Sequence, residues 1–260
     1  MKARYWRTDL YRCFGSWQML LAITGVCAVH FLGAEQFSET GVSVLRSFYR
    51  VWGSNATVLV YLFTTLAYGR CFAEDLEQGY IKYALARGKV INYVISKCIW
   101  IAVSAESAMV LGRMLYIVLM RCRYPWEAGI GELEMLSVFG GFTGLLENGS
   151  YLTYLWIHSV CQGVWAVVLA LLAALVSLYT TNRLLVLAFP VMAHHLIRRI
   201  TVLFRTEKHL MDPDHFFLIN YNALGNDRLT VAAIFLLGGV LSVMIVAAIY
   251  KSVERRGRNG

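Results

Sequence analysis

The sequence has few charged residues for its length. Asp, Glu, Lys and Arg make up 15% of its 260 residues, and hydrophobic residues make up 58%. An average soluble domain has about 25% charged residues and about 45–50% apolar ones. The chain also has no sustained internal repeat, no linker and no low-complexity tract. This composition argues against an ordinary soluble domain and favours a single polytopic membrane domain over residues 1–260.

Motifs of the common catalytic and nucleotide-binding sites are missing. No GxxxxGK[ST] phosphate loop occurs, so we do not expect this chain to bind ATP as P-loop proteins do. The pair His194-His195 lacks the Glu of an HExxH zinc protease motif. The six cysteines form no CxxC pair, and we find neither a nucleophile elbow nor paired carboxylates. We therefore predict no catalytic residue and no cofactor bound by this chain.

One segment carries residue types that bind metals. His209, Asp212, Asp214 and His215 lie together in KHLMDPDHFF, and they would suit zinc or another divalent cation. However, Pro213 indicates a turn, and polar residues cluster in turns for other reasons. We favour the turn and predict no metal site.

Apolar residues are gathered into runs close to the ~20 residues that a spanning helix needs. We predict an all-α fold with six transmembrane helices, at residues 15–32, 55–73, 98–120, 154–178, 184–204 and 229–250. The fifth run contains Pro190, His194 and His195, followed by two arginines, so we expect it to be broken or partly interfacial. No small-residue cleavage site follows the first run, so we do not expect a cleaved signal peptide.

Basic residues predict the orientation. If both termini are cytoplasmic, the cytoplasmic segments contain more Lys and Arg than the outer segments do. This excess predicts cytoplasmic termini. The formal net charge of +8 is then explained by basic residues that set the membrane topology and lie near the inner leaflet. Membrane lipids are the expected partner of this charge, and no nucleic acid is needed to explain it.

The first 14 residues have the pattern of an interfacial helix. Trp6, Leu10, Cys13 and Phe14 recur at helical spacing among basic residues. This predicts an amphipathic helix that lies on the inner leaflet and leads into the first span. A simple basic flank that sets topology is the alternative.

A polar insert, FAEDLEQGYIKYALARGKVINYVISK at residues 72–97, separates the second and third apolar runs. On a helix, Leu76 and Tyr80 would share one face and Asp75 would lie on the opposite one. We predict a short amphipathic helix over 74–88, which needs another surface to dock against.

Two segments resemble a known family. The insert resembles the first cytoplasmic loop of type-2 ABC exporter permeases in the pattern Phe72-Ala-Glu74-Asp75, Gly79, Ile81-Lys82, Leu85, Arg87-Gly88, Tyr93 and Ser96-Lys97. The segment Thr8-Asp9-Leu10-Tyr11-Arg12 before the first span is similar to small bacterial members of that family. With six spans and both ends inside, the resemblance covers most of the chain.

The resemblance implies a transport subunit in the bacterial plasma membrane, with no catalysis of its own. The substrate would be amphipathic, with an antimicrobial or toxin-like peptide favoured. ATP and Mg would sit on a separate ABC ATPase subunit, and a second permease copy or a sister permease would complete the exporter. The helix at 74–88 would be its coupling helix, with these residues at the ATPase contact: Glu74, Asp75, Glu77, Gly79, Tyr80, Tyr83 and Arg87.

The third span carries two charged residues, Glu106 and Arg113. They are two turns apart, about 10.5 Å of rise, so a direct contact is marginal. Charges inside a bilayer usually have partners. We predict that their face lines the bundle interior, with structural pairing and a place in the substrate pathway as alternatives.

Small residues recur every four positions in two of the predicted spans. Ala166, Ala170 and Ala174 do so in the fourth, and Gly238 and Ser242 do so in the sixth. Such rows let helix backbones approach closely. They predict packing within the bundle, with a dimer seam as the alternative.

Two other functions stay open. A polytopic membrane enzyme would need polar residues that converge within the bilayer, for which the candidates are His158, His194, His195, Glu106 and Arg113. A non-transporting membrane anchor or sensor of an ATPase would keep the docking helix but tolerate changes in the membrane interior.

Overall fold

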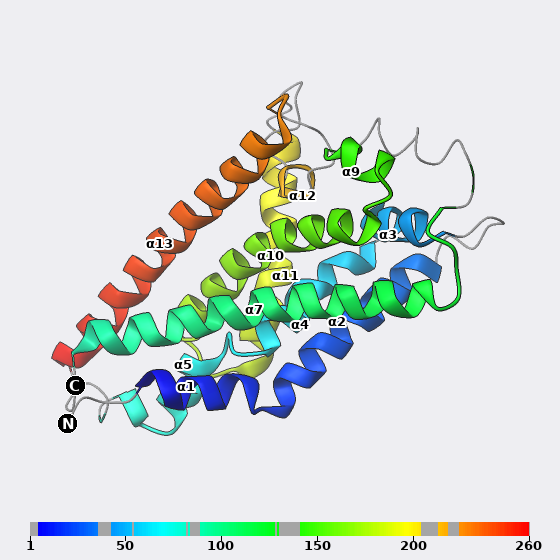
Figure 1. Ribbon diagram of the computed structural model, residues 1–260. Helices are drawn as coiled ribbons and strands as arrows, with labels where there is room; N and C mark the ends of the chain where they lie inside the picture. The colour runs from blue at the N-terminus through cyan, green and yellow to red at the C-terminus, as the bar shows by residue number, and fades with distance from the viewer. Residues whose placement is uncertain are drawn as a thin grey trace.

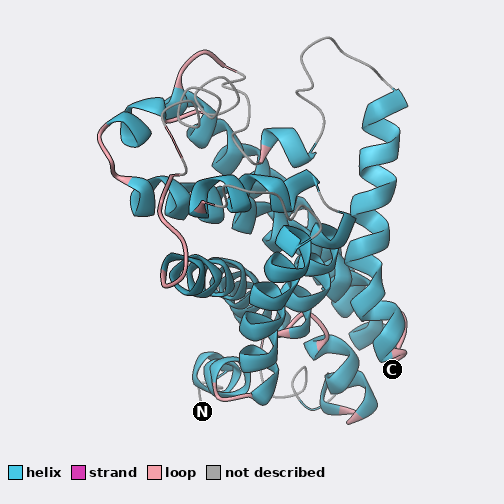
Figure 2. Cartoon of the chain, turned by 90° about the vertical axis from the view of Figure 1, so that its right-hand side faces the viewer, coloured by secondary structure: helices cyan, strands magenta, loops and turns pink. Residues whose placement is uncertain are grey.

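The computed structural model describes residues 5–35, 43–53, 55–81, 83, 89–127, 129, 141–203, 213–217 and 224–259. Within these ranges the secondary structure is helical, and no strand occurs (Figure 2). The prediction of an all-α fold is confirmed to this extent.

Five helices are long and apolar enough to cross a membrane. They are α2 (Trp17–Glu35), α7 (Val90–Arg121), α10 (Tyr151–Val176), α11 (Arg183–Leu203) and α13 (Asp227–Asn259). The shorter elements are α1 (Tyr5–Phe14), α3 (Val44–Gly53), the 3₁₀ turn η1 (Asn55–Val58), α4 (Leu59–Leu66), α5 (Cys71–Glu77), α9 (Thr143–Glu147) and α12 (Pro213–Phe216). Length and composition thus make a multi-pass membrane protein plausible.

The second predicted span is bent. η1 and α4 together rise about 20 Å, which is short of the ~30 Å hydrocarbon core. A turn separates them from α5, whose direction differs by 48°, so six spans are reached only if this bent pair counts as one. By contrast, α11 continues through Pro190. The break that we predicted in the fifth span is therefore absent from α11, and the bend lies in the second.

Two long helices, α7 and α10, form the centre of the bundle (Figure 1). α2 packs on α7, α13 packs on α10 and α7, and α11 packs on α10 and α4. Both chain ends, α1 and α5 lie at one end of the bundle, while α3 and α9 lie at the other.

Small residues bring these helices close together. Ala166, Ala170 and Ala174 of α10 are fully buried within the chain. At Gly112 of α7, an added Cβ would lie 2.6 Å from the Val26 Cβ and 2.8 Å from a backbone oxygen of α2. Because lipid tails are as apolar as the helices, close van der Waals contact is a main source of attraction between spanning helices. The described part of the chain therefore uses the small residues of α10 for its own packing.

We predict that Gly112→Val destabilises the protein, because the new side chain must push α2 away from α7. Overpacking of this kind typically costs about 1–3 kcal/mol. Thermal unfolding in mild detergent would show a lower Tm. Gly239→Ala is the matched control, because a Cβ at Gly239 meets no described atom within 4 Å. Equal Tm values for the two variants would contradict the close α2–α7 contact.

Candidate functional site

Charged side chains from distant parts of the sequence meet where α1, α5 and α7 come together. Asp9 and Arg12 come from α1, Asp75 comes from α5, and Lys97 comes from α7. The side chains of Asp9, Asp75 and Lys97 are buried. We call this group, together with Glu74 and Arg70, the junction cluster.

Lys97 is the central cation of the junction cluster. Its Nζ lies 2.9 Å from Oδ2 of Asp75 and 3.5 Å from Oδ1 of Asp9. Arg12 supplies a second cation, with its Nη1 2.9 Å from Oδ1 of Asp75. At the more exposed edge, Glu74 pairs with Arg12 at 3.4 Å and with Arg70 at 3.1 Å. Three acids thus face three bases, so the cluster carries no net charge.

Hydroxyl groups complete the hydrogen bonding of the two buried carboxylates. Tyr93 donates to Oδ2 of Asp75 at 2.7 Å. Tyr68 donates to Oδ1 of Asp9 at 2.9 Å, and Ser96 donates to its Oδ2 at 2.6 Å. Every oxygen of the two carboxylates therefore has a donor or a cation. The free-energy cost of burying a charge is reduced when each of its polar atoms has such a partner.

Aromatic rings surround the Lys97 ammonium. Its Nζ lies 5.5 Å from the ring centroid of Tyr68, 5.9 Å from that of Phe72 and 5.4 Å from that of Tyr93. Ring faces attract cations at such distances, and more strongly away from water. The junction cluster is thus a largely buried joint without net charge, and it connects α1, α5 and the start of α7.

The structure corrects the predicted role of Asp75. We placed Asp75 on the polar face of the insert and at a partner contact, but its side chain is fully buried in the junction cluster. Its charge is already compensated by Lys97 and Arg12, which come from other helices. Asp75 therefore cannot present a contact to another protein.

The predicted helix over 74–88 also differs from the structure. α5 begins earlier, at Cys71, and ends at Glu77. Gly79 has a φ of +65°, a left-handed conformation that favours glycine and commonly ends helices. The backbone is helical again at Tyr80 and Ile81. The insert thus turns sharply at Gly79 instead of continuing as one helix.

The exposed residues of the insert lie at and beyond the end of α5. Tyr80 and Tyr83 are 38% and 65% exposed. Glu77 is exposed too, and its Oε2 lies 2.8 Å from Nη2 of Arg183 at the start of α11. Glu74 is only partly exposed, and Arg87 lies outside the described residues. Gly79 is exposed as well. The predicted contacts with accessible side chains are therefore Glu77, Tyr80 and Tyr83, which we call the α5 surface.

Glu106 and Arg113 both contact α10, as expected for residues seven apart on one face of α7, but they have different neighbours there. Arg113 is fully buried; its Nε donates to Nε2 of His30 at 3.1 Å and its Nη1 to the backbone oxygen of His158 at 3.4 Å. Glu106 instead lies against Gly163 of α10. The two side chains have different neighbours because two helical turns, about 10.5 Å, separate them along α7.

The polar residues that a membrane enzyme would need come together in pairs: Arg113 donates to the backbone oxygen of His158, and the rings of His194 and His195 lie 6.0 Å apart. His194 accepts a hydrogen bond from Nε1 of Trp165 at 3.1 Å and packs on the Tyr61 ring, while His195 is exposed. Oε1 of Glu106 has no hydrogen-bond partner among the described residues. The enzyme alternative stays a prediction.

The predicted absence of a metal site is tested only in part. Within the described ranges, no group of three or more His, Cys, Asp or Glu could hold a metal ion. His209 and Asp212 lie outside these ranges, and so do the side chains of Asp214 and His215.

Comparisons with protein-family models, with curated proteins and with solved structures found no match. The resemblance to exporter permeases therefore rests on the sequence patterns alone. The segments that carry those patterns, around Asp9, Asp75 and Lys97, are the ones that meet in the junction cluster.

Sequence reasoning missed the junction cluster itself. One signal was present: Asp9 lies four residues before Cys13, and so places an acid on the apolar face of a basic helix. A charge in that position needs a partner. The sequence alone does not tell that the partner is Lys97 of α7.

We predict that Lys97→Met strongly destabilises the protein, because it leaves Asp9 without a cation and weakens the compensation of Asp75. Removing one partner of a buried ion pair typically costs about 3–5 kcal/mol. Chemical or thermal unfolding in detergent measures the loss. Glu77→Gln, which removes a solvent-screened partner at the end of α5, should leave the Tm nearly unchanged. Similar Tm values for both variants would show that the junction cluster is not a structural joint.

Proposed function

We propose that this chain is the transmembrane subunit of an ATP-driven exporter of the type-2 ABC class, in the bacterial plasma membrane. ATP and Mg would be bound by a separate ATPase subunit. A second permease copy or a sister permease would complete the transport unit. The observation that carries the proposal is the α5 surface, which is exposed to a partner yet rigidly joined to a membrane-spanning candidate, α7, through buried ion pairs.

The geometry around α5 suits the transmission of movement. Asp75 lies two residues before Glu77 on the same short helix, and its ion pair with Lys97 reaches α7. Because breaking a buried pair costs about 3–5 kcal/mol, a partner that displaces α5 would move the start of α7 with it. The Glu77–Arg183 contact connects the same helix to α11. One docked surface could therefore act on two long helices.

Gating would then be a rigid-body change between two arrangements of the bundle. Moving such an equilibrium from about 1:99 to 99:1 requires roughly 5.5 kcal/mol of differential binding. Nucleotide binding on the ATPase could supply this amount. Both chain ends and α5 lie at the same end of the bundle (Figure 1), which supports cytoplasmic termini together with the excess of basic residues in the predicted inner segments. An amphipathic substrate, with a peptide favoured, fits the apolar bundle.

We predict that an ATPase with a phosphate loop co-purifies with the tagged chain from its native host in mild detergent. Glu77→Lys with Tyr83→Ala should reduce the recovered ATPase at least tenfold without lowering the Tm, because both residues are exposed. Glu147→Lys is the matched control, since it makes the same charge change at an exposed site on α9 at the opposite end. Mass spectrometry and the Tm of each variant are the measurements.

Two results would count against the proposal. If the chain purifies without any ATPase, the exporter proposal is contradicted and a membrane enzyme becomes the favoured function. An ATPase that is recovered equally well with the double variant would show that the α5 surface is not the contact.

A further inference from the structure

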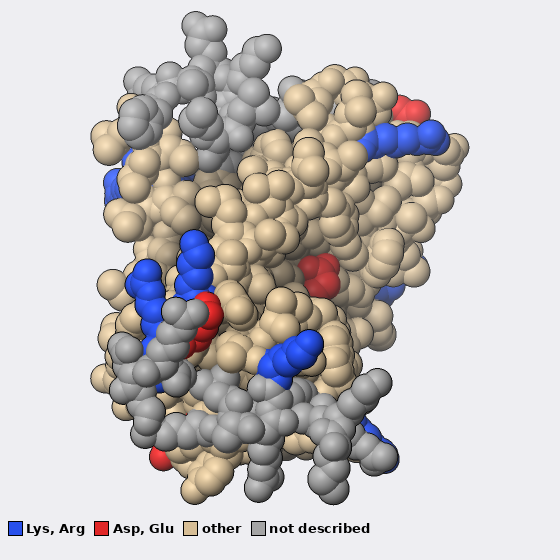
Figure 3. Space-filling model, turned by 90° about the vertical axis from the view of Figure 1, so that its left-hand side faces the viewer, with Lys and Arg blue, Asp and Glu red and all other residues tan. Residues whose placement is uncertain are grey.

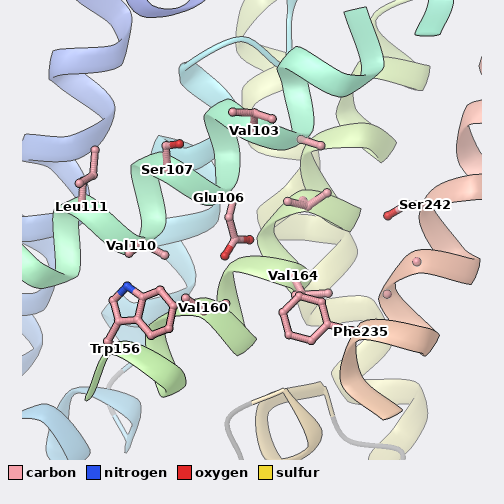
Figure 4. Close-up of a pocket in the computed structure, with 14 residues that line it drawn as sticks. Val103, Glu106, Ser107, Val110, Leu111, Trp156, Val160, Val164, Phe235 and Ser242 are labelled. Atoms are coloured by element: carbon pink, nitrogen blue, oxygen red, sulfur yellow. The ribbon is translucent and has the colours of Figure 1, made fainter. Parts of the chain in front are cut away.

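A pocket of about 670 Å³ opens between α7, α10 and α13, separate from the junction cluster (Figure 4). Its walls are almost entirely apolar, with valines from α7 and α10, Trp156 of α10 and Phe235 of α13. Glu106 is the charged residue among those that line it. Pockets of about 300–1,000 Å³ accommodate small organic ligands.

The Glu106 carboxylate projects from α7 into the space between the three helices (Figure 4). Its Oε1 is buried and has no hydrogen-bond partner among the described residues. The carboxylate is seated against Gly163 of α10, where an added Cβ would overlap it. Figure 3 shows an acidic side chain recessed within a face of the molecule that is mainly uncharged.

This arrangement selects a ligand by charge. A buried carboxylate oxygen without a hydrogen-bond partner costs several kcal/mol in apolar surroundings, and a cation with an N–H donor would offset that cost by supplying both charge and hydrogen bond. The valine walls suit an apolar body. The ring faces of Trp156 and Phe235 are further favourable surfaces for a cation. An anionic ligand would be repelled, and a neutral alcohol could donate a hydrogen bond but would supply no charge.

We propose that the pocket binds a membrane-soluble amphipath with a single ammonium group, and that Glu106 is its counter-ion. The proposal goes beyond the exporter assignment and concerns binding alone. It is therefore tested on the purified full chain without any ATPase, so its failure is distinct from failure of the proposed function.

The experiment measures binding of radiolabelled dodecylamine to the chain in nanodiscs of phosphatidylcholine. Empty nanodiscs correct for partition of the probe into lipid, and dodecanol is the neutral probe of matched chain length. We expect saturable binding of the amine, at least tenfold weaker binding of dodecanol, and at least tenfold weaker amine binding in Glu106→Gln. Glu147→Gln, which removes an exposed acid on α9, should leave binding unchanged.

A second variant tests the pocket without changing charge. Gly239 lines the pocket, and an added Cβ there meets no described atom within 4 Å. Gly239→Leu therefore has room to fold and should abolish saturable amine binding by filling the space. Equal binding of dodecanol and dodecylamine would identify an acyl-chain groove that does not recognise charge, and would overturn the proposal. Undiminished amine binding in either Glu106→Gln or Gly239→Leu would overturn it as well.

Discussion

The buried ion pairs that Lys97 makes with Asp9 and Asp75 are the interaction on which the rest of the structure depends. They join α1, α5 and α7, together with the Arg12–Asp75 ion pair and the hydrogen bonds that Ser96 and Tyr93 donate to the same carboxylates. Ion pairs in dry surroundings resist separation because each freed charge would lack both water and a partner. The position of the α5 surface, and hence any partner contact there, follows from this joint.

Three charged side chains of α7 have three different kinds of surroundings. Lys97 is neutralised by two carboxylates and surrounded by aromatic rings. Arg113 is buried, and its guanidinium donates to His30 and to a backbone oxygen. Glu106 borders an apolar pocket, and its Oε1 has no hydrogen-bond partner among the described residues. The first two are stabilised by the protein itself, whereas for the third we propose a bound ligand as the partner.

The correct predictions and the wrong ones depend on interactions of different range along the sequence. Five of the six predicted apolar runs correspond to long helices, because both length and hydropathy are local properties. The same runs missed the bend between α4 and α5, since apolar composition does not reveal a turn. They also overstated the effect of Pro190, because a spanning helix can accommodate a proline when its neighbours satisfy the freed backbone groups.

The sequence by itself determined the all-helical class, the long apolar helices and the polar character of the insert after α4. Tertiary structure alone decided which acids of that insert are exposed: Asp75 is buried and Glu77 is exposed, although both lie on α5. Helical periodicity assigned Asp75 to the polar face, and in the structure this face packs against Lys97 and Arg12. Hydropathy and periodicity describe neighbours along the chain, whereas the pairing of a buried charge depends on residues that only folding brings near.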